Sequence, residues 1–387
     1  MSNGELYAGR EQTLVKHFIL QKYLERFAYI VGAHWDTLTY VDCFSGPWNG
    51  RSDRFEDSSF AIALKELRNA RDTLAKQRGR TVQLRCFFLE RNRAAFAKLK
   101  EFADGVKDAK IETRNATLEE SISDISGFVK GGGTKAFPFV FIDPTGWTGF
   151  EMETITPLLR LNPGEVLINF MTGHIRRFLD SPQEETQDGF RRLFGSGAFR
   201  AKVQGLALLE REDAAVEEYT RNAKSVGGFN FGCNAIVLHP EIDRTHFNLI
   251  YLTRNLKGIE VFKDAEKKAM ELQETARADA QQRKRVARKG QPELFGSKEF
   301  HDSTHYESLR ERYLAKARGL VQHALESNGR LLYEDAWILA LSEPMSWESD
   351  LKLWVKEWKE EGRLEVVGIQ PGQRVPHRSE GNYLTWK

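Results

Sequence analysis

The chain has 387 residues, of which 41% are hydrophobic and 29% are charged, and its formal net charge at pH 7 is +2. This composition is ordinary for a globular protein, and it supplies enough apolar material for a core that needs no metal or disulfide staples. The length indicates two domains. The small net charge excludes no class of partner, because local clusters of charge decide the affinity for nucleic acid.

Cysteine usage and the N-terminus indicate a reducing compartment. The three cysteines, Cys43, Cys86 and Cys233, are odd in number and widely spaced, so neither a disulfide framework nor a metal site is expected. Residues 1–10 are polar and lack the apolar core of a signal peptide. No run of about 18 apolar residues occurs, so no membrane span is expected. We therefore predict a cytoplasmic protein with no membrane contact.

The first 170 residues carry an alternating pattern of strands and helices. Apolar residues at helical spacing predict a helix over 10–31 ahead of the first strand. Strands are predicted at 38–44, 82–89, near Ile111, 137–142 and 165–170, and helices at 58–75, 93–103, 118–129 and 151–159. This rhythm predicts an α/β fold with a Rossmann-like parallel sheet covered on both faces. The carboxyl ends of its strands would share one edge, where ligands bind in such folds.

The rest of the first domain departs from this rhythm. Residues from about 174 to 226 are helical and charged, which predicts an insertion, and 229–238 and 246–253 predict a hairpin. A helix over about 259–280 closes the domain, and five basic residues fall within 283–289. We place a first domain at 1–282, a basic linker at 283–303 and a second domain at 304–387. The basic run is either a solvated linker or a patch that steers phosphates.

The second domain predicts a winged-helix fold. Helices are expected at 306–326, 333–341 and 346–362, and strands at 363–369 and 382–386 flank a loop rich in Pro, Gly and Arg. Winged helices bind DNA, and they also dock proteins. The third helix mixes three lysines with five acidic residues, so the loop with Arg374, His377 and Arg378 is the better nucleic-acid contact. DNA or RNA contact and protein docking both remain open.

The end of the first predicted strand is the most informative segment. Asp42 ends the strand, and Phe44, Ser45, Gly46 and Pro47 form a turn that lets backbone N–H groups approach a ligand. No Gly-Lys-Ser/Thr follows, so this is not a P-loop, and the spacing is not that of a dinucleotide-binding G-x-G-x-x-G motif. An ordinary tight turn between strand and helix is the alternative.

Polar residues also follow the next strands of the predicted sheet. Glu90 ends the second strand, where a carboxylate can hold a ribose diol, and Asn115 follows the third strand, where an amide can read an adenine edge. Asp143, Pro144 and Trp147 follow the fourth strand. The acid can accept a hydrogen bond from an exocyclic amine, and the indole can stack on a base. The alternative is a structural Asp-Pro turn with Trp147 in the core.

These segments resemble class I S-adenosylmethionine-dependent methyltransferases, most closely the amino-methylating enzymes of nucleic acids. The segment Asp42–Pro47, Glu90 and Asp143-Pro144 carry that resemblance. Together with KHFILQKYL at 16–24, FIDPTGW at 141–147 and TRNLKG at 253–258, they resemble the three-Cys-motif partner family over roughly residues 10–275. That resemblance implies S-adenosylmethionine as the cofactor and a phage-related, metal–sulfur partner protein with a three-cysteine motif.

The resemblance implies roles for individual residues. Asp42, the turn from Phe44 to Pro47, Glu90 and Asn115 would bind the cofactor, and Asp143, Pro144 and Trp147 would position the amino group of a base for methylation. Two departures are visible: Trp48 stands where related enzymes commonly have Gly, and the Asp-Pro-Thr-Gly-Trp segment shifts its aromatic residue by one position. They motivate one alternative, a non-catalytic or differently catalytic nucleotide-binding subunit docked to the partner. A second alternative is a DNA-binding regulator that acts through its winged helix, with the sheet domain sensing a ligand.

Overall fold

The computed structural model describes residues 6–46, 52, 55–178, 181–197, 199–290, 296–371, 373 and 375–387. Three residues named above, Pro47, Trp48 and Arg374, lie outside this described part. The chain divides into two compact units, Met1–Gly232 with Ile236–Phe300, and Cys233–Ala235 with His301–Lys387.

The first unit contains β1 to β5, β7 and most of β6 of a seven-stranded mixed sheet with the order β3-β2-β1-β4-β5-β7-β6. Its strands are β1 Thr37–Asp42, β2 Gln83–Leu89, β3 Lys110–Arg114, β4 Ala136–Ile142, β5 Glu165–Phe170, β6 Phe231–Leu238 and β7 Thr245–Thr253. Strands β1 to β5 pair in parallel, whereas β7 pairs antiparallel with β5. The connection between β6 and β7 is too short for a parallel crossover, so these two strands form a hairpin. The α/β fold predicted from the sequence is thereby confirmed.

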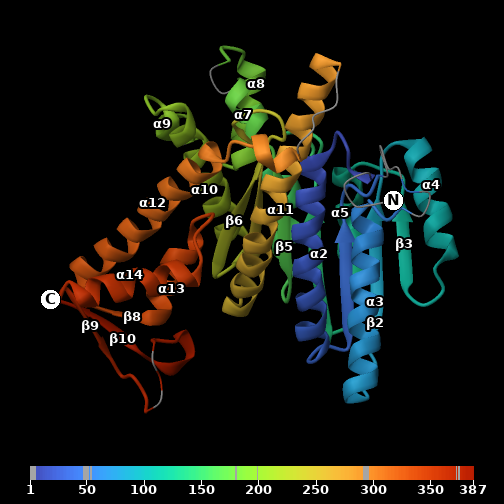
Figure 1. The fold of residues 1–387 in the computed structure, drawn as a ribbon. Coiled ribbons are helices and arrows are strands. Elements are labelled where there is room, and N and C mark those ends of the chain that lie inside the picture. Colours follow the sequence, from blue (N-terminus) through green and yellow to red (C-terminus); the bar gives the residue numbers. More distant parts are fainter. Residues whose placement is uncertain are drawn as a thin grey trace. The chain divides into compact units, whose positions relative to one another are not determined.

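Helices cover both faces of this sheet. On one face, α2 (Glu11–Gly32), α3 (Ser59–Arg78) and α11 (Leu256–Lys289) lie side by side (Figure 1). The helix α4 (Arg93–Gly105) joins β2 to β3 and contacts α3 through an edge-to-face pair of aromatic rings, Phe60 and Phe102. The other face carries α5 (Leu118–Lys130), α6 (Met152–Leu159) and α10 (Leu208–Gly227). Helices α3, α4 and α5 begin at the side-chain caps Ser58, Asn92 and Thr117, each of which satisfies a free backbone N–H group.

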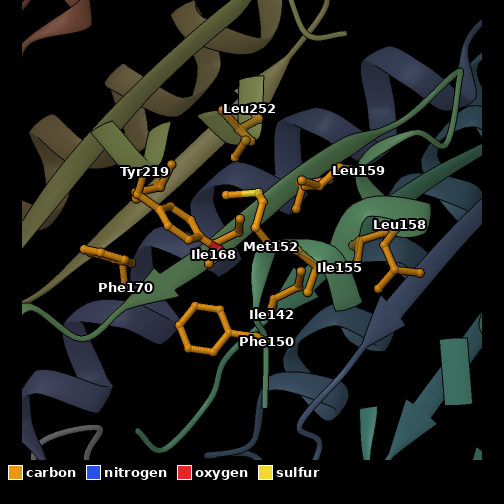
Figure 2. Packing of buried hydrophobic residues seen from close by; sticks show 14 of the residues in the cluster. Ile142, Phe150, Met152, Ile155, Leu158, Leu159, Ile168, Phe170, Tyr219 and Leu252 are labelled. Carbon is orange, nitrogen blue, oxygen red and sulfur yellow. The ribbon is translucent and has the colours of Figure 1, made fainter. Parts of the chain in front are cut away.

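The core under α5, α6 and α10 is predominantly aliphatic with aromatic inserts (Figure 2). Strand residues such as Ile142 and Ile168 meet Met152 and Ile155 of α6 there, all at most 2% exposed. Tyr219 of α10 packs on Phe170, with the ring centroids 4.6 Å apart. Alternate residues of buried parallel strands face opposite layers, and so the other face receives its own core, which is rich in Phe and Tyr.

The helical insertion consists, in the described residues, of α7 (Thr172–Phe178), α8 (Glu184–Phe194), α9 (Phe199–Val203) and then α10. The structure differs from the sequence-based expectation at the end of the unit. The basic run 283–289, expected in a linker, forms the last turns of α11, which ends at Gly290 with φ +69°. Arg, Lys and Ala are good helix formers and no breaker precedes Gly290, so the helix continues.

The TRNLKG segment forms a buried junction between β7 and α11. Arg254 donates to the backbone carbonyls of Leu161, Gly164 and Gly227, which anchors three connecting segments. Thr253 donates to the buried carboxylate of Glu165 at 2.8 Å, and that carboxylate also accepts from Tyr23 of α2. The TRNLKG segment therefore has a role in packing, because it ties β7 and α11 to the connecting segments around them.

The second unit contains, within its described residues, three helices and a three-stranded antiparallel sheet. Its elements are α12 Thr304–Asn328, β8 Arg330–Leu332, α13 Tyr333–Ser342, α14 Glu348–Glu360, β9 Leu364–Val367 and β10 Tyr383–Trp386, with a short 3₁₀ turn at Arg378–Glu380. The sheet has the order β8-β10-β9. Its core is formed around Trp337 and Trp358, both fully buried. In the described part of the chain, we find no helix with the length and apolar character that crossing a membrane requires.

Candidate functional site

The sheet reverses its winding between β1 and β4, and the predicted site residues gather at that point. In the register, Asp42 pairs with Phe88 of β2 and with Phe141 of β4. Glu90 and Asp143 lie two positions beyond these partners, so three acidic residues follow neighbouring strands at one edge. In open α/β sheets, the crevice outside such a switch point is where ligands bind.

Asp42 is a fully buried carboxylate held by three donors. Its Oδ2 accepts from the Ser59 hydroxyl at 2.6 Å and from the Tyr40 hydroxyl at 3.2 Å, and its Oδ1 accepts from the Phe44 N–H at 3.1 Å. No cation pairs with it in the described part of the chain. Burial therefore raises the pKa of Asp42 to about 6, although its hydrogen bonds act in the opposite direction.

Glu90 is the corresponding acid at the end of β2, and it is 2% exposed. Its Oε1 accepts from the Asn92 N–H, and burial raises the pKa of the carboxyl to about 7. Among the described residues, no lysine or arginine forms an ion pair with it. Asn115 lies beside Glu90 at the end of β3, and its amide nitrogen donates to the backbone carbonyls of Glu90 and Arg91 at 2.8 and 3.0 Å. Asn115 thus holds the Glu90 turn and leaves only its amide oxygen for a ligand.

Asp143 forms a three-residue cluster that crosses two strands and a helix. Its Oδ2 lies 2.5 Å from Nζ of Lys16 on α2, and its Oδ1 accepts from Nδ2 of Asn169 at 2.7 Å. Ile142 of β4 pairs with Ile168 of β5, so the next residue of each segment, Asp143 and Asn169, lies at the same level of the sheet near its carboxyl edge. The helix that precedes the sheet therefore supplies the counter-ion for the acid of β4.

A cavity of about 270 Å³ opens at this cluster. Its walls come from α2, from the segments that follow β1, β4 and β5, and from the start of β7, which reaches this edge because β7 is antiparallel. Its lining includes Lys16, Phe44, Gly46, Asp143, Pro144, Asn169 and Phe247. Arg10 and Asp57, which form an ion pair at 2.5 Å, also line it. The cavity wall thus contains two ion pairs, each with its cation on or next to α2.

The turn after β1 is tied to the sheet. The Ser45 N–H donates to the Leu89 carbonyl at 2.8 Å, and the Ser45 hydroxyl donates to the Asp42 carbonyl at 2.9 Å. Phe44 and Gly46 reach the cavity, whereas Ser45 itself is 1% exposed. Of the predicted turn, Ser45 therefore anchors the backbone, and Phe44 and Gly46 face the space where a ligand would lie.

Trp147 lies elsewhere than the sequence prediction of a base-stacking residue requires. Its indole stacks on Phe190 of α8 with the ring centroids 4.9 Å apart, and it packs against the aliphatic core. A Cβ at Gly189 would fall 2.5 Å from the indole, so that glycine makes room for the ring. Trp147 does not belong to the cavity lining. It fastens the helical insertion to the segment after β4, which is the alternative left open above.

Sequence reasoning missed Lys16, Arg10, Asp57, Ser59 and Phe247 as residues of the site. Lys16 and His17 stand within the apolar stripe of α2, and both are less than 10% exposed. Nδ1 of His17 hydrogen-bonds the Tyr7 hydroxyl at 2.9 Å, and burial lowers the pKa of His17 well below its ordinary value. Charged residues inside an apolar helical stripe were the available signal, because buried charges are paired.

The three cysteine side chains are buried, and burial raises the pKa of the Cys43 thiol well above its ordinary value. A neutral, enclosed thiol is a poor nucleophile and a poor metal ligand. Among the described residues, no group of three or more His, Cys, Asp or Glu side chains is arranged to hold a metal ion.

Comparison with known proteins gives structural similarities of low extent. No family model matches the chain, and no curated protein matches it. Protein LPL1258 from Legionella pneumophila, of family DUF519, matches with a TM-score of 0.34 and 9% identity over 61% of this chain and 84% of that protein. A loganic acid methyltransferase with SAH matches with a TM-score of 0.31 and 9% identity over 72% of this chain and 89% of that enzyme. Similarity of this extent does not indicate a shared function.

Proposed function

We propose that the first unit is an S-adenosylmethionine-dependent methyltransferase that acts on the amino group of a nucleic-acid base. One observation carries the proposal: two buried carboxylates, Asp42 and Glu90, end neighbouring strands at the switch point, and neither pairs with a cation in the described part of the chain. Keeping uncompensated acids buried costs stability, so their presence points to a ligand that supplies hydrogen-bond donors.

The residues present fit this cofactor. In this proposal the Glu90 carboxylate accepts hydrogen bonds from a ribose diol, and such donors would favour its charged form and offset the effect of burial. Asp42 fixes the Phe44 N–H, and together with Ser45 it holds the turn whose Phe44 and Gly46 line the cavity. The amide oxygen of Asn115 is available to the adenine amine. When bound, S-adenosylmethionine would supply a methyl group carried on a positively charged sulfur.

The cavity on the β4 side suits the amine that receives the methyl group. Asp143 and Pro144 both line it, and the carboxylate of Asp143 can accept a hydrogen bond from an amine while Lys16 balances its charge. Most of the rate of such a transfer comes from holding the reacting groups in line. The role of the protein is therefore to position the amine and to exclude water.

The test is calorimetric titration of S-adenosylmethionine and of its demethylated product into the full chain. We expect saturable binding that falls by about tenfold or more in Glu90→Gln and in Asp42→Asn, because each substitution removes a charged acceptor. Asp104→Asn, which changes an exposed carboxylate on α4, is the matched control and should bind as the wild type does. If neither compound binds the wild-type chain and neither changes its melting temperature, the proposal is refuted. Transfer of labelled methyl groups to pooled DNA and RNA then tests the substrate.

For the second unit we propose a winged-helix module that docks a partner protein, for which the resemblance implies the metal–sulfur, three-cysteine-motif protein. The observation in favour is the surface of this unit. Lys352 and Lys356 of α14 pair with acids one turn away on the same helix, which leaves little charge for phosphates. Leu353, Val367 and Val375 are 39–52% exposed, and such side chains suit a protein interface better than a nucleic-acid backbone.

The docking proposal is tested by co-purification of the full chain with the three-cysteine protein. We expect Leu353→Glu to weaken the complex, whereas Lys356→Gln should not. A gel shift with duplex DNA and with RNA gives the opposing outcome: tight, salt-sensitive binding that is lost in Lys356→Gln would assign the unit to nucleic acid and refute protein docking.

A further inference from the structure

The basic run at 283–289 ends α11 at the carboxyl edge of the sheet. Because β7 is antiparallel, α11 begins at the amino edge and runs toward the carboxyl edge. There Arg283 pairs with Glu11, the first residue of α2, and Nζ of Lys284 lies 3.0 Å from Oε2 of Glu241 in the turn between β6 and β7. The residue before Glu11 and the start of β7 both line the cavity. The basic end of α11 is therefore anchored next to two walls of the cavity.

Four exposed cations at this edge form no ion pair with any residue that the structure describes. We call them the basic rim: Arg288 and Lys289 in the last turn of α11, Arg244 in the turn between β6 and β7, and Arg177 in α7. The helix α7 begins one residue after β5, and Arg176 donates to the backbone carbonyl of Thr245 at 3.3 Å. That contact places α7 against the first residue of β7, which follows Arg244. The basic rim thus gathers cations from three separate segments.

The acids next to the basic rim already have cationic partners. Two of them pair with the basic run of α11. Oδ1 of Asp243 lies 2.5 Å from a guanidinium nitrogen of Arg277, and Glu212 of α10 pairs with Arg176 of α7. The basic rim is therefore a local surplus of positive charge, although the whole chain carries a net charge of only +2. Such a surplus attracts polyanions and raises their rate of association.

The helix dipole alone does not explain the basic rim. Cations in the last turn of a helix stabilise it, and α3 likewise ends with exposed Lys76 and Arg78. That helix precedes β2, so its basic end lies at the amino edge, away from the cavity. The dipole also gives no account of Arg244, which lies in a turn, or of the meeting of three basic segments at one edge.

We propose that the basic rim binds the phosphodiester backbone of a nucleic-acid strand and holds that strand beside the cavity. The guanidinium groups of Arg177, Arg244 and Arg288 can each donate two parallel hydrogen bonds to a phosphate, and Lys289 contributes a point charge. Contacts of this kind position a strand but do not read its bases. The basic rim therefore provides affinity for a polymer, and a free nucleoside, which lacks phosphates, gains nothing from it.

This assignment places the polymer contact in the first unit. The sequence alone leaves the run at 283–289 open as a linker or a patch that steers phosphates, and it favours the loop of the second domain as the contact for nucleic acid. With the basic rim in that role, the second unit is left to protein docking. The inference rests on the proposed function only for the identification of the bound strand as the substrate.

The test is fluorescence anisotropy of labelled single-stranded DNA and RNA oligonucleotides titrated with the full chain at several salt concentrations. In single strands each neutralised phosphate contributes about −0.7 to the slope of log K against log salt, so four contacts predict a slope of about −3. The double variant Arg288→Gln/Lys289→Gln removes two contacts. We expect its slope to fall to about −1.4 and its binding at about 0.1 M salt to weaken on the order of tenfold.

The double variant Lys76→Gln/Arg78→Gln is the matched control, because it removes the same charge from the last turn of a helix at the opposite edge. It should bind oligonucleotides as the wild type does, and the melting temperature checks that both variants fold. Equal weakening in the two double variants would reduce the effect to net charge and overturn the inference. Loss of binding in Lys356→Gln instead, or binding to anionic phospholipid vesicles without binding to oligonucleotides, would also overturn it.

The two proposals fail separately, because the cofactor is titrated without any oligonucleotide. Binding of S-adenosylmethionine without binding of oligonucleotides refutes the basic rim and leaves the cofactor assignment standing. Oligonucleotide binding that depends on Arg288 and Lys289, without binding of S-adenosylmethionine, supports the basic rim and refutes the methyltransferase.

Discussion

In Gly258→Ala, a gain in helix propensity is opposed by a steric clash in the junction between β7 and α11. Gly258 is the third residue of α11, and alanine at an unconstrained helical position stabilises a protein by at most about 1 kcal/mol relative to glycine. At this position, however, an added Cβ would lie 2.9 Å from Oε1 of Glu165 and 2.9 Å from Oγ1 of Thr253, and closer still to the Tyr251 hydroxyl. Atoms of a buried hydrogen-bonded cluster would therefore have to move.

The expected loss combines two terms. Overpacking a filled interior costs about 1–3 kcal/mol. Displacing a hydrogen bond to the buried Glu165 carboxyl adds about 1.5–3 kcal/mol. After a gain in helix propensity of about 1 kcal/mol is subtracted, we expect a net destabilisation of about 1.5–5 kcal/mol. Each kcal/mol lowers the melting temperature of a domain of this size by about 2–4 °C.

The assay is urea unfolding followed by circular dichroism, together with thermal melting. Gly127→Ala in α5 is the matched control, because an added Cβ there meets no atom within 4 Å. We expect that variant to be as stable as the wild type or slightly more stable. If Gly258→Ala also gains stability, Tyr251, Glu165 and Thr253 do not pack against Gly258 as described here. The packing role of the TRNLKG segment would then be refuted.

Three further predictions concern the carboxyl edge of the sheet and the insertion. Burial raises the pKa of Glu90 from its ordinary value of 4.5 to about 7, so the folded protein holds this proton more tightly than the unfolded chain does. Its contribution of about 3 kcal/mol to the free energy of unfolding is present below pH 4.5 and is lost as the pH rises through 7. In urea unfolding, the free energy of unfolding of Glu90→Gln should therefore differ less between pH 5 and pH 8 than that of the wild type does. An equal difference in the two proteins would contradict the raised pKa of Glu90. Trp147→Ala should speed tryptic cleavage in α8 without changing methyl transfer, since the indole packs on Phe190; a loss of methyl transfer with an intact insertion would return Trp147 to the site. Tyr219→Phe should change stability by less than about 1 kcal/mol in urea unfolding, because the buried Tyr219 hydroxyl has no hydrogen-bond partner in the described structure, and a larger loss would reveal a partner.

The alternation of strands and helices was predictable because it depends on local patterns. Buried strands of a parallel sheet are short continuous apolar runs, and each helix shows its own periodicity or cap. Asp42, Glu90 and Asp143 could be placed at one edge for the same reason, since right-handed crossovers bring the carboxyl ends of parallel strands together. Predicting that these three residues share one edge of the sheet required no information about contacts between distant segments.

In two places the structure differs from what local signals suggested. The composition of 283–289 suggested a linker, but its residues are good helix formers and continue α11 to Gly290. The aromatic residue after β4 suggested base stacking, whereas Trp147 is drawn toward Phe190 and Gly189 in an insertion whose packing the sequence does not encode locally.

By itself, the sequence determined which strands end in acids and that these acids share an edge of the sheet. Only the tertiary structure decided what surrounds them. Lys16 lies 127 positions before Asp143 and becomes its partner because α2 packs over the sheet, and Phe247 reaches the cavity because β7 runs antiparallel. Charge pairing and hydrogen-bond satisfaction are properties of contacts between distant segments. A local pattern can show that a charge will be buried, as for Lys16, but it does not show which distant residue becomes its partner.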